Sequence, residues 1–326
     1  MSDLLLPGGA QHLRLASLVN KALGDRPPTL AIIHPCDAHA LQAADIVTRL
    51  GIARAVLVGA RHRIESAARA AQVGLDLLEV VEPPTAYDDP EGDARAAAAL
   101  GVSLARAGAV NALMKGSLHT DTLMSEVVRG DTGLRTARRI SHAFVFDVPR
   151  YPKLIALSDC VVNIVPDLRA KRDILLNGLD LLRDTLGVAM PKVGILSAVE
   201  TVNPQIPATV DAAALVVEAR TGAFGQSIVD GPFGFDNVIS AEAARTKGID
   251  SQVAGDADLL IVPDLNAGNM LYKSFVYVGG AECAGLVLGA RVPIVMTSRA
   301  ESLLARVASA ALAALAARSA GQAASL

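Results

Sequence analysis

Short apolar runs alternate with helix-like segments along almost the whole of this chain. The runs are rich in Val, Ile and Leu, and most end directly before small or polar residues that open a helical pattern. Strands buried on both faces of a parallel sheet have this continuous apolar character, and helices usually join parallel strands. The alternation therefore predicts an α/β fold with a largely parallel sheet. The runs predicted as strands are Leu30–Ile33, Ala55–Val58, Val110–Met114, Arg138–Val148, Leu154–Leu157, Val161–Ile164, Val193–Leu196, Ser227–Val229, Leu259–Val262, Gly285–Leu288 and Pro293–Met296.

The composition places the chain among folded globular proteins. Of its 326 residues, 52% are hydrophobic and 19% are charged. This balance allows a large buried core and excludes an intrinsically disordered chain. The formal net charge is −3, and no run of basic residues stands out, so we expect no nucleic-acid partner.

Cysteine usage and hydropathy predict a soluble, cytoplasmic protein. Cys36, Cys160 and Cys283 are odd in number and far apart, which indicates neither a disulfide framework nor a metal site. The first residues lack the basic and apolar regions of a signal peptide. Arg306 interrupts the Ala-rich segment 303–317, which we expect to form an amphipathic helix rather than a membrane span. We therefore expect no membrane partner.

The predicted domain boundary lies near residues 135–150, where Pro149 and Pro152 flank Tyr151. The final helix, Glu301–Ala317, follows the last predicted strand and is expected to return to the first domain. The first α/β domain is thus predicted to be discontinuous and to comprise residues 1–140 and 300–326. The second α/β domain is predicted to comprise residues 141–299.

The segment Ser298-Arg299-Ala300-Glu301 lies between an apolar run and a long helical pattern. In one interpretation it is a capping box, in which Ser298 caps the helix and Glu301 reaches back. In the other, Arg299 and the first N–H groups of the helix hold a phosphate, because a guanidinium presents paired donors and a fixed charge. The two interpretations are compatible, since a cap leaves other first-turn N–H groups available.

Two further loops follow predicted strands. In Asp264-Leu265-Asn266-Ala267-Gly268-Asn269, Gly268 permits close approach of a ligand to the backbone, and Asn269 is expected to cap the helix that carries Lys273. The loop Asp230-Gly231-Pro232 is a weaker signal, typical of an ordinary turn. Simple strand-to-helix connections are the alternative interpretation of both segments.

Lys115-Gly116-Ser117 stands at the end of a predicted strand and leads into His119. Lys115 could neutralise a ligand phosphate, and His119 could donate a hydrogen bond to it. A solvated lysine and a helix-capping Thr120 are the alternative.

The remaining motifs are structural or absent. His34-Pro35-Cys36-Asp37 ends the first predicted strand, and Asp37 is expected to cap the next helix. The chain contains no P-loop, no dinucleotide fingerprint after the first strand, no defensible Ser-His-Asp order and no cluster of metal ligands.

Several of these segments together resemble a known family. The resemblance is carried by KGSLHTD, RISHAFVFDVP, DGPFGFDNVISAEAARTKGIDSQVAGDADLLIVPDLNAGNMLYKS and GLVLGARVPIVMTSRAES. They are similar to the phosphate acetyltransferase/phosphate butyryltransferase family, and more so to its butyryltransferase-like branch. The resemblance runs from about residue 10 to residue 317 and is densest between residues 225 and 302. The combination of segments is specific, although no single segment is.

The resemblance implies reversible acyl transfer, in which acyl-CoA and phosphate give acyl phosphate and CoA. It also implies two three-layer αβα domains related to the isocitrate/isopropylmalate dehydrogenases, an active site in the cleft between them, and a homodimer. Coenzyme A would be a substrate, and no permanently bound cofactor or metal is expected. The catalytic residues implied are Ser298, Arg299, Glu301 and Asp264, and the substrate- or CoA-binding residues are Lys115, Gly116, His119, Asn266, Gly268, Asn269 and Lys273.

The chain departs from the acetyltransferase pattern at two positions. Those members carry an aspartate seven residues after the serine, proposed to take the thiol proton, where this chain has Ala305. They also carry an arginine ten residues after the motif glycine, where this chain has Glu126. A free thiol is mostly protonated at neutral pH, so its attack needs assistance. Glu301, Asp264 or a positive site are the alternatives for that assistance.

Two other functions are weighed against acyl transfer. A dehydrogenase of the related fold acting on a hydroxy acid would need a carboxylate cluster for a divalent metal, which the sequence lacks. A non-catalytic homologue that binds CoA or phosphate is mildly indicated by Ala305. Retention of Ser298, Arg299, Gly268 and Asn269 indicates an active enzyme instead.

Overall fold

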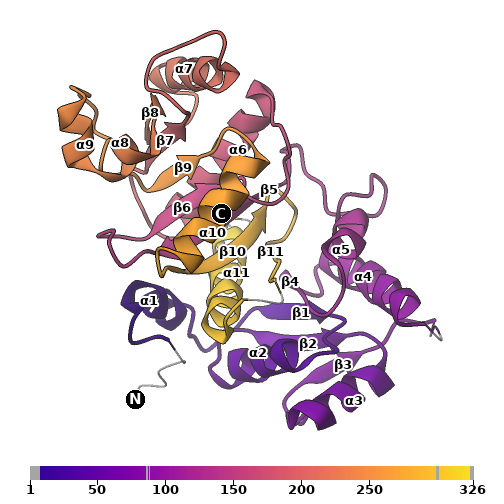
Figure 1. The fold of residues 1–326 in the computed structure, drawn as a ribbon. Coiled ribbons are helices and arrows are strands. Elements are labelled where there is room, and N and C mark those ends of the chain that lie inside the picture. The colour runs from indigo at the N-terminus through magenta and orange to yellow at the C-terminus, as the bar shows by residue number, and fades with distance from the viewer. Residues whose placement is uncertain (1–7, 86, 88, 299–300, 324–326) are drawn as a thin grey trace. The chain divides into compact units, whose positions relative to one another are not determined.

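The computed structural model describes residues 8–85, 87, 89–298 and 301–323 (Figure 1). The chain divides into two compact units. The first unit contains Met1–Arg138 and Ala284–Leu326, and the second contains Arg139–Cys283. The first unit is therefore assembled from two separate stretches of the chain.

Mostly parallel strands form the sheet of the first unit. Their order is β3-β2-β1-β4-β11, and β10 pairs antiparallel with β11. The register pairs Ile33 with Lys115 and Ile294 with Leu113, so β11 joins β4 although the two strands are far apart in the sequence. The elements are α1 (Leu13–Lys21), β1 (Thr29–Ile33), α2 (Ala38–Arg49), β2 (Arg54–Val58), α3 (Arg61–Ala71), β3 (Glu79–Val81), α4 (Pro90–Arg106), β4 (Ala112–Lys115), α5 (Thr120–Val127), β10 (Glu282–Leu288), β11 (Ile294–Val295) and α11 (Leu303–Ala323).

Two helices of the first unit begin at an aspartate that caps them. Asp37 accepts a hydrogen bond from the Ala40 N–H (2.9 Å) and starts α2, which confirms the predicted cap. Asp89 accepts one from the Gly92 N–H (2.7 Å) and starts α4. These carboxylates satisfy N–H groups that have no partner inside the helix.

The helix α11 is a core helix rather than an amphipathic one. Every side chain from Leu304 to Ala314 is buried, and the helix packs against α1 and α2. Within the described residues, Leu303–Gly321 is the one helical segment long and apolar enough to cross a membrane by length and composition, and 61% of its apolar stretch is buried in the protein. A helix that is apolar on every side also suits a protein core. The amphipathic prediction was wrong, because the alanines let neighbours cover all its faces.

The strands of the second unit follow the order β5-β6-β9-β7-β8. β5 and β6 pair antiparallel, whereas β6, β9, β7 and β8 are parallel neighbours. The predicted α/β class with mostly parallel strands is thus confirmed. The elements are β5 (Ser141–Asp147), β6 (Ile155–Ser158), α6 (Leu168–Asp180), a π-helical turn (Leu181–Thr185), β7 (Lys192–Leu196), α7 (Pro207–Arg220), β8 (Ile228–Phe233), α8 (Phe235–Ile239), α9 (Ala241–Thr246), β9 (Leu259–Ile261) and α10 (Leu265–Tyr277).

An aromatic cluster fastens α10 to the sheet of the second unit. Tyr272 stacks on Phe144 of β5 with ring centroids 4.2 Å apart, and Phe275 meets Phe146 edge to face at 5.1 Å. Such ring pairs stabilise a contact beyond the area they bury. They hold α10, which carries several predicted site residues, in one orientation on the sheet.

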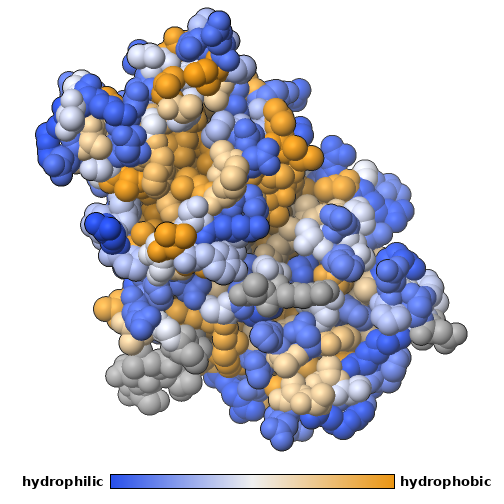
Figure 2. Space-filling model, viewed as in Figure 1, coloured by the Kyte–Doolittle hydropathy of each residue, from blue (hydrophilic) through white to orange (hydrophobic). Residues whose placement is uncertain are grey.

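The second unit also exposes apolar side chains. Met270 on α10, and Tyr277 and Val278 at its end, are 63%, 70% and 88% exposed. Figure 2 shows apolar patches on the visible face of this unit. Large exposed apolar patches, more than single exposed residues, mark surfaces that contact other molecules.

One predicted strand is absent. Val161–Ile164 forms a turn, because the N–H groups of Val161, Val162 and Asn163 donate to the Asp159 carboxylate at 2.8, 3.0 and 3.2 Å. Backbone groups engaged by a side chain are not available to a sheet. Apolar character alone therefore misassigned this segment.

The predicted strands Gly285–Leu288 and Pro293–Met296 belong to the first unit. We expected them in the second domain, with the return to the first at residue 300. In the structure the return comes at Ala284, because β11 completes the first sheet by pairing with β4. A long-range strand pairing of this kind has no signal in the local sequence.

Candidate active site

The carboxyl ends of three parallel strands lie side by side at one edge of the first unit. β1, β4 and β11 are neighbours in that order, so the loops that follow Ile33, Lys115 and Val295 emerge together. Ligands of open α/β sheets bind at this edge. Three polar segments identified in the sequence lie on these loops, namely those that contain Asp37, Ser117 and Ser298.

Gly116 joins the β4 loop to the β1 loop. The Gly116 N–H donates to the Ile33 carbonyl and the Ser117 N–H to the His34 carbonyl, both at 2.9 Å. A Cβ on Gly116 would lie 2.5 Å from the Ile33 oxygen and 2.7 Å from the His34 oxygen. Only glycine allows two backbone segments to come this close. Backbone packing therefore requires a glycine at position 116.

A hydrogen bond between side chains also joins these two loops. The Ser117 hydroxyl donates to Asp37 Oδ2 at 2.7 Å. Burial acts to raise the pKa of Asp37, but the bonds from Ser117 and the Ala40 N–H, with the positive charge of Arg306, lower it overall. Asp37 is therefore an ionised acceptor at neutral pH, and it orients the Ser117 hydroxyl.

Lys115 is buried rather than solvated. Its side chain is 7% exposed, and Nζ donates to the carbonyls of Gly116 (3.2 Å) and Leu118 (3.1 Å). These bonds shape the loop after β4 around a positive charge. The alternative interpretation as a solvated lysine is wrong, because backbone carbonyls replace water around the ammonium.

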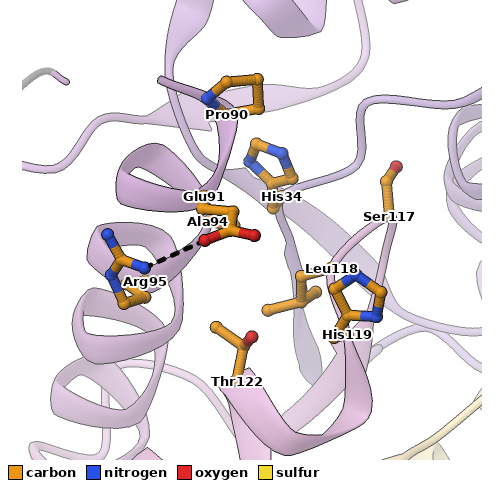
Figure 3. A pocket seen from close by; sticks show the side chains of 9 residues that line it. All are labelled: His34, Pro90, Glu91, Ala94, Arg95, Ser117, Leu118, His119 and Thr122. Carbon is orange, nitrogen blue, oxygen red and sulfur yellow. Dashed lines mark hydrogen bonds and ion pairs between the residues drawn. The ribbon is translucent and has the colours of Figure 1, made fainter. Parts of the chain in front are cut away.

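A small cavity of about 230 Å³ opens beside the β1 and β4 loops (Figure 3). Burial lowers the pKa of His34, so its ring is neutral at pH 7 and can accept as well as donate a hydrogen bond. The cavity is large enough for part of an organic ligand. Its polar lining residues are His34, Glu91, Arg95, Ser117, His119 and Thr122.

His119 is the N-cap residue of α5, but its side chain makes no capping hydrogen bond. Figure 3 shows the ring beside the cavity, with Thr122 one turn further along the same helix. The predicted hydrogen-bonding role of His119 towards a ligand stays a prediction.

The Ser298 loop combines two capping interactions. Glu301 Oε1 accepts from the Ser298 N–H at 2.9 Å, as the capping-box interpretation predicts. Ser302, not Ser298, caps α11, since its hydroxyl accepts from the Ala305 N–H at 2.9 Å. The predicted helix start is therefore corrected from Ser298 to Ser302. Arg299 lies outside the described residues.

Arg306 fastens this loop from within α11. Its Nη2 donates to the Ser298 carbonyl (2.7 Å), and its Nη1 donates to the Thr297 hydroxyl (3.2 Å). The side chain is only 4% exposed. A buried guanidinium thus holds the backbone on which Ser298 stands.

The remaining predicted site residues lie around the start of α10 in the second unit. Asp264 caps α10 by accepting from the Ala267 N–H at 2.9 Å. Gly268 packs against the turn that follows β6, and a Cβ there would lie 2.6 Å from the Asp159 carbonyl oxygen. Asn269 lies inside the helix and donates to the Cys160 carbonyl (3.5 Å), so its predicted capping role was wrong. Asn266 and Lys273 are exposed.

The structure also places at the site polar residues that the sequence analysis did not assign to it. Arg306 and the Asp37–Ser117 pair act on the Ser298 and Lys115 loops, and Asp159 organises the turn against which Gly268 packs. A charged residue inside an Ala-rich helix was a visible signal for Arg306. No sequence signal joins Asp37 to Ser117, because the two come together only through the pairing of β1 with β4.

These features define a class of protein. It is an α/β protein whose polar loops, with a buried lysine and a buried arginine, gather at the carboxyl edge of a parallel sheet, where anionic ligands bind.

Comparison with known proteins narrows this class. The family model described as "Phosphate acetyl/butaryl transferase" matches residues 91–314. A phosphate acetyltransferase of Rhizobium meliloti is 47% identical over 306 residues, which cover 94% of each chain. A probable phosphate butyryltransferase of Bacillus subtilis (strain 168) is 37% identical and covers 89% of this chain and 93% of its own. The chain belongs to the phosphate acetyl/butyryltransferase family, and the acyltransferase class predicted from its motifs is confirmed.

Solved structures support the same assignment. A branched-chain phosphotransacylase from Enterococcus faecalis V583 superposes with a TM-score of 0.76 at 28% identity, covering 89% of this chain and 99% of its own. A putative 4-hydroxythreonine-4-phosphate dehydrogenase from Salmonella typhimurium shares the fold at a TM-score of 0.57 and 12% identity, with coverage of 89% and 99%. The predicted kinship with a dehydrogenase fold is thus confirmed at the level of architecture, while a dehydrogenase activity is not favoured.

Proposed function

We propose that this protein exchanges a short acyl group between coenzyme A and inorganic phosphate, so that acyl-CoA and phosphate give acyl phosphate and CoA. The observation that carries the proposal is the Ser298 loop, which follows β11 beside β4 and is held by buried Arg306. Family membership supports the same reaction. Ser298 and Arg299 are proposed to bind the acyl-phosphate group.

The reaction is proposed to proceed in one ternary complex. The thiolate of CoA attacks the carbonyl carbon of the acyl phosphate and a C–S bond forms. The bond between that carbon and the bridging oxygen breaks, and phosphate leaves with this oxygen and the electron pair. Negative charge grows on the carbonyl oxygen and on the leaving phosphate. Ser298 and Arg299 would stabilise that charge, and one well-placed donor typically contributes about 3 kcal/mol. No covalent acyl-enzyme is needed.

Glu301 is our proposed acceptor of the thiol proton. The resemblance to acetyltransferase members implies an aspartate at this position, but the residue here is Ala305, which cannot titrate. Glu301 is half-buried and bonded to the Ser298 N–H, which keeps its carboxylate next to the proposed acyl-phosphate pair. Asp264 is the second candidate, but one of its oxygens already caps α10.

The variant Glu301→Gln tests this role and preserves the cap, because the amide oxygen can still accept from the Ser298 N–H. The expected result is a slower reaction and loss of the fall in rate that the wild type shows at low pH, where a carboxylate base becomes protonated. A pH–rate profile of kcat/KM measures this. A profile of unchanged shape and height would leave Glu301 with the capping role alone.

We propose substrate-binding residues in each of the two units. Lys115, Gly116 and His119 of the first unit, with Asn266, Gly268, Asn269 and Lys273 of the second, are proposed to bind CoA or phosphate. Buried Lys115 supports this because it fixes a positive charge at the end of β4. Gly116 and Gly268 pack tightly against neighbouring backbone, and so fix the course of the segments that carry the other proposed residues.

The acyl group is proposed to be short. Named relatives of this chain include phosphate acetyltransferases and phosphate butyryltransferases. Purified protein should release a free thiol when mixed with phosphate and acetyl-, propionyl- or butyryl-CoA, followed with a thiol reagent. Comparison of kcat/KM for the three substrates assigns chain length. Absence of thiol release from all of them would refute the proposed reaction.

The variant Arg299→Ala tests the proposed binding of the acyl-phosphate group by Ser298 and Arg299. We expect a loss of most activity, about a hundredfold or more, because one oxyanion or phosphate donor typically contributes that factor. Circular dichroism should show unchanged folding. Wild-type rates in the folded variant would show that Arg299 has been assigned the wrong role.

A homodimer in the cytoplasm is proposed as the working state. The exposed Met270, Tyr277 and Val278 support a self-association surface on the second unit. The three cysteines are free thiols, which suits a reducing compartment. Light scattering after gel filtration measures the mass, and a monomer at micromolar concentration would refute the dimer.

A further inference from the structure

α11 begins with a charge that its surroundings do not favour. Arg306 lies in the first turn of the helix, where the helix dipole is positive and repels a cation. It is 4% exposed, and Leu304, Ala305 and Val307 beside it in the sequence are buried too. Burial of a guanidinium is costly unless its charge and its donors find partners.

The partners of Arg306 satisfy only part of this need. Nη1 and Nη2 donate to the Thr297 hydroxyl and the Ser298 carbonyl, which are neutral groups. Nε is buried with no hydrogen-bond partner in the described structure. Nor does any described carboxylate lie within ion-pair distance of it; Asp37 feels its charge only at longer range. The positive charge is therefore fixed beside the Ser298 loop and not neutralised there.

A second arginine on the same helix, Arg318, has bonds that fit a purely structural role. Arg318 donates to the Ala22 carbonyl (2.6 Å) and more weakly to the Ile52 carbonyl (3.5 Å), and so ties α11 to the rest of the unit. It lies in the last turns of α11, where a cation interacts favourably with the dipole. Arg306 lies at the opposite end, next to the proposed phosphate-binding pair.

We propose that Arg306 is a positioning residue for the phosphate-binding site, a role that rests on the proposed function. Its two bonds set the backbone of Thr297 and Ser298, and its uncompensated charge raises the affinity of this loop for phosphate and for the phosphate group of the acyl phosphate. The anion is the missing counter-charge: when it binds, the site holds the negative charge that the described residues around Arg306 do not supply.

Arg306→Met removes the charge and both donors and keeps the apolar stem. Loss of the two hydrogen bonds destabilises the variant, but removal of an unpaired buried charge also removes its desolvation cost. We expect the variant to fold, and to bind inorganic phosphate at least about tenfold more weakly than the wild type by isothermal titration calorimetry. The KM for phosphate should rise while the KM for acyl-CoA changes little. Arg306→Lys keeps the charge but cannot span both oxygen acceptors. Its phosphate affinity should therefore lie between that of the wild type and that of Arg306→Met.

Arg318→Met is the matched control. It should lower the melting temperature without changing phosphate affinity or the KM for phosphate. If Arg306→Met fails to fold, the phosphate affinity of Arg306→Lys is compared with that of the wild type instead.

The outcomes separate this role from the reaction itself. Phosphate affinity within twofold of the wild type in the folded Arg306 variants, or no measurable phosphate binding by the wild type, would overturn the role of Arg306. Wild-type protein that binds phosphate through Arg306 but releases no thiol would refute the proposed reaction and retain the role of Arg306.

Discussion

Gly116→Ala offers a sharp test of how the site is built. The new Cβ would lie 2.5 Å from the Ile33 oxygen and 2.7 Å from the His34 oxygen, both backbone atoms that cannot rotate away. The β4 loop must then move off the β1 loop and loses the bonds from the Gly116 and Ser117 N–H groups. Two backbone hydrogen bonds contribute about 1–3 kcal/mol, and the bond from Ser117 to ionised Asp37 adds about 1 kcal/mol or more. We expect the free energy of unfolding to fall by about 2–4 kcal/mol.

Urea unfolding of the variant and the wild type measures this change, provided that both transitions have the same slope. The kcat/KM for acyl-CoA should fall by at least about tenfold, because displacement of site groups by about 1 Å costs up to about a hundredfold. Gly130→Ala is the control, since no atom lies within 4 Å of the added Cβ there. A Gly116→Ala protein within about 0.5 kcal/mol of the wild type would refute the close-packing argument.

The remaining predictions concern pH. The pKa of Asp37 is lowered in the folded protein, so its contribution to stability is complete above its unfolded pKa of about 3.9 and is lost as the pH falls through the lower, folded value. Asp37→Asn should therefore lose less stability than the wild type between pH 5 and 3 in urea unfolding; identical pH dependences would contradict this. His142 is fully buried, neither ring nitrogen has a partner within the described residues, and burial lowers its pKa to about 3. The unfolded chain binds a proton below about pH 6.5 and the folded chain does not, so stability should fall by up to about 1.4 kcal/mol per pH unit between pH 6.5 and 4. His142→Leu should flatten that slope, and an unchanged slope would show that His142 titrates normally.

Local chemistry was readable from the sequence wherever neighbours along the chain decide the structure. Branched apolar residues predicted the strands β1, β2 and β7, and Asp37 predicted the start of α2. The pairing of Glu301 with the Ser298 N–H also followed from a three-residue spacing. The family was readable in the same way, because its motifs are contiguous segments.

Other features depended on contacts that the sequence does not encode locally. Val161–Ile164 has the apolar character of a strand, but N–H groups of this segment donate hydrogen bonds to the Asp159 carboxylate. Asn269 is of a residue type that often caps helices, but Asp264 caps α10. The Asn269 side chain donates a hydrogen bond to the Cys160 carbonyl instead.

The amino-acid sequence by itself determined the α/β class, the family and the segments that carry the chemistry, since each depends on residues a few positions apart. Only the tertiary structure decided that β11 completes the first sheet beside β4, and so which loops meet. It also decided that Lys115 and Arg306 are buried charges rather than surface ones. The physical reason is that strand pairing and burial are set by free energies summed over residues far apart in the chain, and no local pattern records that sum.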